Sequence, residues 1–318
     1  MEPRVHAPPR RSDGGGGTKR RVMAQARSWQ WPAVRARGTG RGGSGRSRSV
    51  EASQTARVMM AWLIASVRLQ ACMPGQGKTV AGSIILAYNL DGLGGDLKLS
   101  RDVYVDICLG KITTWDDPRL KAINPHVRLP HDTIALVVRQ DSSGTTYAFT
   151  NHLSAMGAKW RDQGPGVGRV IAWPSHPMLA PGNEGVAGRI KNSKGAIGYV
   201  EYGFAQRAGL PMAWLENKAG QFIQPRGDSG TATLLKVEMP ENLRIFFPDP
   251  DGKDSYPIVT FSWLLLYKHY DDQPKAAALK QYIKWCLTEG QAFNDALGYI
   301  RLAPQVIARA MTAVDSIR

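Results

Sequence analysis

The sequence predicts an α/β protein that follows a strongly basic segment, and two observations support this prediction. Apolar runs typical of buried strands alternate with segments of helical spacing from Val80 to Arg318. In addition, 15 of the 41 Lys and Arg residues lie within residues 1–80, together with only 3 of the 26 acidic residues. The net charge of +15 therefore belongs mainly to the first 80 residues, and the rest of the chain is close to balanced.

The expected strands are continuous apolar runs that are too short for most helices. The first should be fully buried, and the last is a long apolar run. They cover residues 80–90, 133–139, 195–200 and 258–267.

The expected helices are placed by apolar residues that recur every three or four positions and by residues that begin or end a helix. The helix over 275–289 is the clearest, because Leu279, Ile283 and Leu287 share one face and Gly290 should end it. A short helix should follow Asp117, with Pro118 in its first turn. The remaining helices are expected over residues 101–110, 144–156, 183–192 and 304–317.

Residues 1–79 form a low-complexity basic segment that we expect to be disordered or to come from a frame-shifted start. The run Gly14 to Gly17, the Arg-Gly pairs and the scarcity of aliphatic residues cannot supply a hydrophobic core. Read as a genuine Arg/Gly-rich tail, the segment suggests the alternative of a nucleic-acid-binding protein. For the folded body we expect no nucleic-acid partner, because its charge is nearly balanced.

Two short motifs at the end of this segment imitate targeting and nucleotide-binding signals. Residues 57–72 imitate a secretion signal, but Arg68 interrupts its apolar run, and export or lipid anchoring at Cys72 stays open. Residues 74–79 imitate the phosphate-cradling loop of nucleotide-binding enzymes, although that pattern needs glycine where Cys72 stands. We expect no nucleotide site.

The sequence also indicates a protein without a metal, a cofactor or catalytic residues. Cys72, Cys108 and Cys286 are far apart and show no metal-ligand spacing, and at most one disulfide could form. No nucleophile has a base at a suitable spacing. No apolar run reaches the roughly 18 residues that a transmembrane helix needs.

The most informative stretch is the octapeptide Arg139–Thr146, which directly follows the apolar run 134–138. Ser143, Gly144 and Thr145 should lie on the first turn of a helix, where backbone N–H groups lack partners and the dipole is positive. Arg139 offers a planar fork of donors that suits a tetrahedral oxyanion, and Asp141 is close enough to hold that fork. These residues predict a site for a small oxyanion such as phosphate. The alternative is an N-capped helix beside a surface ion pair.

The octapeptide resembles the anion loop of periplasmic phosphate-binding proteins, the solute receptors of bacterial phosphate ABC transporters. Four other segments resemble the same family in the same order: residues 109–118, 182–187, 195–202 and the tail from Tyr256. Together the segments span residues 80–318, and no resemblance extends before them.

The resemblance implies a periplasmic-binding-protein type II-like fold, in which two α/β lobes hold the ligand between them. On that pattern, residues 80–91 and 257–318 are a remnant of the first lobe, and residues 92–256 are the second lobe. The family's phosphate ligands from the second lobe match Arg139, Asp141, Ser143, Gly144 and Thr145. Its ligands from the first lobe match nothing in residues 1–79. We therefore expect an incomplete first lobe and an impaired phosphate affinity.

The resemblance further implies a non-enzymatic receptor located in the periplasm or cell envelope. Its partners would be inorganic phosphate and the membrane permease of the transporter, and it would act as a monomer.

Overall fold

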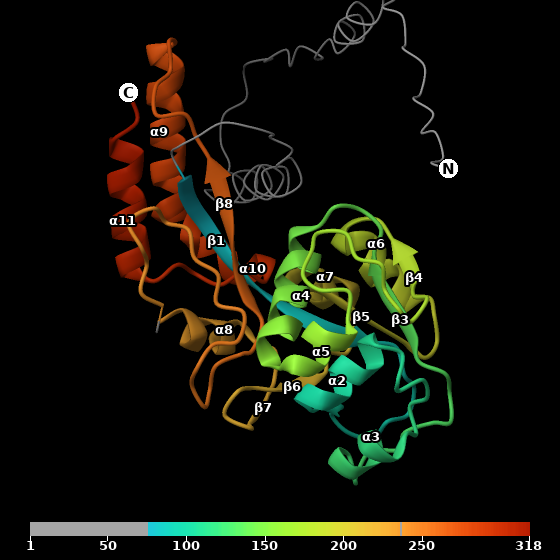
Figure 1. Ribbon diagram of the computed structural model, residues 1–318. Coiled ribbons are helices and arrows are strands. Elements are labelled where there is room, and N and C mark those ends of the chain that lie inside the picture. Colours follow the sequence, from blue (N-terminus) through green and yellow to red (C-terminus); the bar gives the residue numbers. More distant parts are fainter. Residues whose placement is uncertain (1–75, 236) are drawn as a thin grey trace, which may run out of the picture. The chain divides into compact units, whose positions relative to one another are not determined.

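The computed structural model describes residues 76–235 and 237–318, which belong to one compact unit (Figure 1). One sheet has five strands in the order β4-β3-β5-β1-β8, and a second sheet has three in the order β2-β6-β7. The larger sheet consists of β1 (Gln76–Tyr88), β3 (Ala135–Arg139), β4 (Met178–Ala180), β5 (Ala196–Glu201) and β8 (Val259–Leu265). The smaller consists of β2 (Lys98–Leu99), β6 (Trp214–Glu216) and β7 (Phe222–Ile223).

Helices alternate with these strands, which confirms the α/β class. The helices between β2 and β5 are α2 (Arg101–Cys108), α3 (Pro118–Ile123), α4 (Gly144–Met156), α5 (Ala158–Gln163) and α6 (Gly182–Lys191). After β5 come α7 (Tyr202–Ala208), α8 (Gly227–Leu234), α9 (Gln273–Leu287), the 3₁₀ helix η1 (Glu289–Phe293), α10 (Asn294–Leu297) and α11 (Pro304–Asp315).

Strand β1 joins the two ends of the larger sheet. Its first part pairs antiparallel with β8, with Ala81 opposite Phe261, and its second part pairs antiparallel with β5, with Leu86 opposite Tyr199. Figure 1 shows β1 as a long strand that runs from the C-terminal helices α9 and α11 toward β5.

The start of β1 differs from the sequence prediction by four residues. The apolar run alone predicted a strand from Val80, but β1 begins at Gln76, because its first residues pair with β8. Gln76 lies opposite Leu265, and the register shifts between Lys78 and Val80. Residues 76–79 are therefore part of β1, and the first two residues of the motif 74–79 lie outside the described ranges.

Strands β3, β4 and β5 run parallel, and α4 begins shortly after the end of β3. Helix α4 packs on this sheet through Phe149, whose ring stacks on Tyr199 of β5 with 4.7 Å between the ring centroids. Trp173 stacks on both rings. These three side chains are buried, so the orientation of α4 relative to β3 and β5 is fixed by aromatic packing.

The C-terminal segment packs β8, α9 and α11 against the first half of β1. Asp272 caps α9 by accepting a hydrogen bond from the backbone N–H of Lys275. The prediction that Gly290 ends this helix was wrong, because α9 ends at Leu287 and Gly290 lies inside η1. A Cβ on Gly290 would lie 3.1 Å from the carbonyl oxygen of Trp285, so this glycine permits a close approach of the two turns.

Several predictions fall on residues outside the described ranges. These concern the basic segment up to residue 75, its possible nucleic-acid role, the signal-like residues 57–72 and Cys72. Within the described ranges, Cys108 and Cys286 are buried free thiols, and no group of three or more His, Cys, Asp and Glu residues could hold a metal ion. The same residues contain no helix with the length and hydropathy of a membrane span.

Candidate anion-binding site

The candidate site is built where β3 ends and α4 begins, as the octapeptide predicted. Arg139 is the last residue of β3, and Ser143 is the N-cap of α4, its Oγ accepting a hydrogen bond from the backbone N–H of Thr146 at 3.1 Å. Ser143 is buried and still has its own hydroxyl hydrogen to donate. The helix covers residues 144–156, the range that the apolar spacing predicted.

Arg139 and Asp141 form a two-point ion pair inside the loop. Nε of Arg139 donates to Oδ1 of Asp141 at 2.8 Å, and Nη2 donates to Oδ2 at 2.5 Å. Arg139 holds the pKa of Asp141 down at about 2, with the backbone N–H of Gly182 as a further, weaker cause. Asp141 therefore stays ionised and keeps the guanidinium in one plane and one direction.

The remaining donors of Arg139 point toward the first turn of α4. Nη1 lies 3.4 Å from Oγ1 of Thr145, so the free edge of the guanidinium and this hydroxyl share one small region. Within the described chain, the backbone N–H groups of Gly144 and Thr145 have no acceptor, which is usual for the first turn of a helix. Apart from its chain neighbours and the backbone of α4, no described heavy atom lies within 4 Å of the place that a Cβ on Gly144 would take, so the turn is open to approach.

The hydroxyl of Tyr199 on β5 holds both ends of the loop. It accepts the backbone N–H of Arg139 at 3.1 Å and lies 2.7 Å from Oγ1 of Thr146. Burial raises the pKa of Tyr199 to about 12, so the hydroxyl keeps its proton and can donate to Thr146 while it accepts from Arg139. The end of β3 and the start of α4 are thus held by the same phenol.

The start of α6 adds a second helix N-terminus to this region. The backbone N–H of Gly182 donates to Oδ1 of Asp141 at 2.9 Å. The side-chain Oδ1 of Asn183 lies 3.3 Å from Nη1 of Arg139 and 3.4 Å from Oγ1 of Thr145. Sequence reasoning placed Asn183 only at a helix start and missed it as part of the site, since the segment 182–187 comes near Arg139 only through the pairing of β3 with β4.

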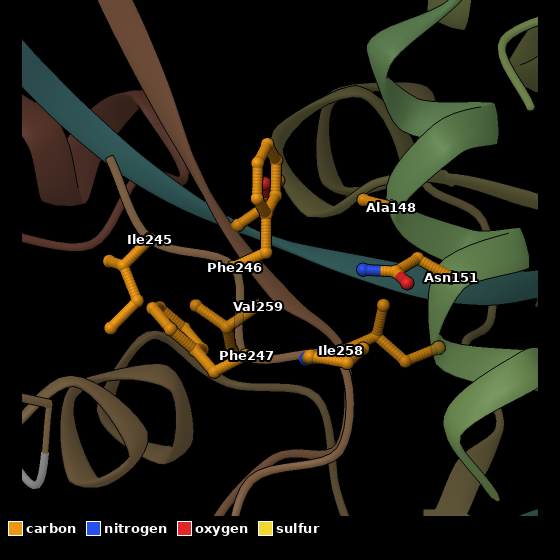
Figure 2. Close-up of a pocket in the computed structure, with 9 residues that line it drawn as sticks. Ala148, Asn151, Ile245, Phe246, Phe247, Ile258 and Val259 are labelled. Atoms are coloured by element: carbon orange, nitrogen blue, oxygen red, sulfur yellow. The ribbon is translucent and has the colours of Figure 1, made fainter.

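A further, small pocket lies beside α4 and does not suit an anion (Figure 2). In Figure 2, Ala148 and Asn151 of α4 lie on one side of it and the phenylalanines on the other. Its lining contains no ionisable side chain and consists of Ala148, Asn151, Ile245, Phe246, Phe247, Pro248, Ile258, Val259 and Thr260. The anion site is therefore assigned to the loop and not to this pocket.

Comparisons with known proteins agree with the fold. The model of the PBP superfamily domain matches residues 76–289. The phosphate-binding protein PstS of Methanocaldococcus jannaschii is 38% identical, and the match covers 77% of this chain and 68% of that protein. The protein of the same name from Pasteurella multocida is 35% identical, over 74% of this chain and 68% of that protein.

Solved structures show the same two-lobed fold. A high-affinity periplasmic phosphate-binding protein with phosphate bound aligns with a TM-score of 0.62 and 21% identity, over 74% of this chain and 70% of that one. A phosphate-binding protein from Stenotrophomonas maltophilia aligns with a TM-score of 0.59 and 17% identity, over 80% and 76% of the two chains. The fold and the superfamily match define a solute-binding protein. Within that class, the chain belongs to the PstS family of phosphate-binding proteins.

Proposed function

We propose that the chain binds inorganic phosphate through Arg139, Asp141, Ser143, Gly144 and Thr145. The observation that carries the proposal is the guanidinium of Arg139, which Asp141 fixes beside the open first turn of α4. The relatives from M. jannaschii and P. multocida are named phosphate-binding proteins, which supports phosphate as the anion.

Each residue has a separate task in this proposal. Arg139 uses Nε and one hydrogen of Nη2 for Asp141. Its other three N–H groups can donate to phosphate oxygens, since Nη1 makes only long contacts, with Thr145 at 3.4 Å and Asn183 at 3.3 Å. Gly144 and Thr145 offer backbone N–H groups at the positive end of α4, and the hydroxyls of Ser143 and Thr145 add donors. Asp141 does not touch the anion and orients the arginine.

The affinity should be lower than that of a site with ligands from both lobes. The described residues that meet at the site come from the β3–α4 loop and the start of α6, which are parts of the expected second lobe. Charge-assisted hydrogen bonds contribute about 1.5–3 kcal/mol each, so the loss of two or three from an opposing lobe weakens binding by roughly 100-fold or more. Discrimination against sulfate should weaken for the same reason.

The proposal also implies a role in phosphate import. We expect it to act outside the cytoplasmic membrane as a monomer and to deliver phosphate to the permease of an ABC importer. No catalytic step is required, because the Ser143 hydroxyl caps the N-terminus of α4, and none of its described hydrogen bonds is with a general base.

Equilibrium dialysis of the full chain with radiolabelled phosphate tests the proposal. We expect saturable binding at one site per chain and a loss of about tenfold in Thr145→Val, which removes one hydroxyl donor without changing side-chain size. Thr312→Val is the matched control, because the Thr312 hydroxyl bonds only to the carbonyl of Ala308 within α11. Binding that is unsaturable, or equal in the wild type and Thr145→Val, would contradict the assignment.

A further inference from the structure

Asn183 occupies an unusual position between a cation and a carboxyl group. Its Oδ1 accepts from Nη1 of Arg139 at 3.3 Å and from Oγ1 of Thr145 at 3.4 Å, while its Nδ2 lies 3.5 Å from Oε2 of Glu201. The direction of the amide follows from chemistry, because a guanidinium can only donate and must therefore face the carbonyl oxygen. An ionised carboxylate, conversely, must face the amide nitrogen.

The two groups that bond to this carbonyl are also two of the proposed phosphate donors. A phosphate oxygen that reaches Nη1 of Arg139 and Oγ1 of Thr145 would have to replace Oδ1 of Asn183. The replacement is favourable in principle, since the two existing contacts are long and a charged oxygen is a stronger acceptor than an amide carbonyl.

Glu201 lies at the end of β5 in a confined place. A Cβ on Gly82 of β1 would lie 2.8 Å from its Oε1, and the hydroxyl of Tyr299 lies 3.5 Å from its Oε2. Burial raises the pKa of Glu201 to about 7, against the smaller lowering effects of Arg207 on α7, Tyr299 after α10 and Arg139 on β3. Both protonation states are therefore accessible near neutral pH.

We propose that Asn183 is an additional phosphate-binding residue whose amide turns over when phosphate binds, and that Glu201 is the positioning residue that governs this turn. After the turn, Nδ2 donates to a phosphate oxygen and Oδ1 faces Glu201. Only the protonated carboxyl can donate to that oxygen, so phosphate binding takes up a proton from solvent in each molecule whose Glu201 was ionised before binding. This inference rests on the proposed function and adds a pH-dependent residue to the same site.

The pH dependence of affinity follows from the fraction of Glu201 that carries its proton. One pH unit above its pKa, the competent fraction is about one tenth, so the apparent Kd rises about tenfold. Phosphate itself titrates in this range, and the comparison must therefore be made against Glu201→Gln, which is neutral and can donate at every pH. The ratio of the wild-type Kd to the Glu201→Gln Kd should be close to 1 at pH 6 and about 10 at pH 8.

Isothermal titration of the full chain with phosphate measures both the Kd and the number of protons taken up on binding. Repeating the titration at pH 7 in buffers with different ionisation enthalpies should show a larger proton uptake in the wild type than in Glu201→Gln. Asn183→Asp, which can only accept and adds a negative charge, should weaken binding at least tenfold. Asn192→Asp is its control, because the exposed Asn192 bonds only to the carbonyl of Gly188 at the end of α6.

The outcomes separate this inference from the proposed function. If phosphate binds in an Arg139-dependent way but the Kd ratio stays flat with pH and Asn183→Asp binds normally, the inference is wrong and the site assignment stands. If the wild type does not bind phosphate, both fail. Circular dichroism verifies the fold of Glu201→Gln before the comparison, and its glutamine side chain is nearly isosteric with the glutamate that it replaces.

Discussion

The substitution Arg139→Lys tests the most specific feature of the site, the planar fork of donors. A lysine keeps the positive charge but cannot make the paired contacts that Nε and Nη2 make with Asp141 at 2.8 and 2.5 Å. It also has no second nitrogen with which to reach Thr145 and an anion together. The substitution therefore removes the planar arrangement of N–H donors and keeps the positive charge.

The size of the effect follows from the number of bonds lost. Arg139 can offer two donors of its free edge to one phosphate, and an ammonium offers one in a less defined direction. The loss of one charge-assisted bond costs about 2 kcal/mol, which raises the Kd by ~30-fold. The free energy of unfolding should change by less than about 1 kcal/mol. The Asp141 side chain is 45% exposed, so water can hydrate its carboxylate once the contacts with Arg139 are lost.

Isothermal titration with phosphate and thermal unfolding measure the two quantities on the same variant. Arg301→Lys is the control, because Arg301 makes a similar two-point pair with Asp295 and is exposed. A Kd for Arg139→Lys within about threefold of the wild-type value, with unchanged unfolding, would refute the claim that the guanidinium fork binds the anion.

Three further predictions concern the loop and the sheet that supports it. Ser143→Ala removes the N-cap contact with Thr146 and should lower the free energy of unfolding by about 1 kcal/mol in urea titrations; an unchanged midpoint would contradict the capping role. Gly198→Ala would place a Cβ 2.5 Å from the carbonyl oxygen of Val137, so it should disturb the pairing of β3 with β5 and cost about 1–3 kcal/mol; a wild-type melting temperature would contradict this close approach. The pKa of Asp141 is lowered to about 2, so its contribution to stability is complete above about pH 4 and is lost as the pH falls toward 2. The melting temperature of the wild type should therefore fall more steeply than that of Asp141→Asn between pH 5 and pH 2.5, and parallel curves would count against the ion pair.

The parts of the fold that could be predicted are those with a local signal. Helix α4 was predicted over its full range, because Phe149 and Leu153 recur on one face and Ser143 is a good N-cap. The start of β1 was placed too late, because its first residues become strand only by pairing with β8, more than 180 positions further along the chain. The strands β2, β4, β6 and β7 were missed, since two or three residues are too few to show a period.

The candidate site likewise contains residues that a local sequence signal predicts and residues that it does not predict. Arg139, Asp141, Ser143, Gly144 and Thr145 lie within one octapeptide, so their proximity follows from the sequence and the structure brings them together. Asn183 reaches this loop from α6, and Glu201 at the end of β5 contacts Asn183. Both contacts depend on the parallel pairing of β3 with β4 and with β5. No local pattern in the sequence encodes that pairing.

The central claim is that the loop between β3 and α4 binds phosphate with an affinity limited by ligands from one lobe. Isothermal titration of the full-length chain with phosphate, repeated with sulfate, tests it most directly. We predict one site per chain with a Kd above about 1 μM and a preference for phosphate over sulfate of less than about 100-fold. No saturable heat up to millimolar phosphate would contradict the site itself, and a submicromolar Kd would contradict the account of its affinity.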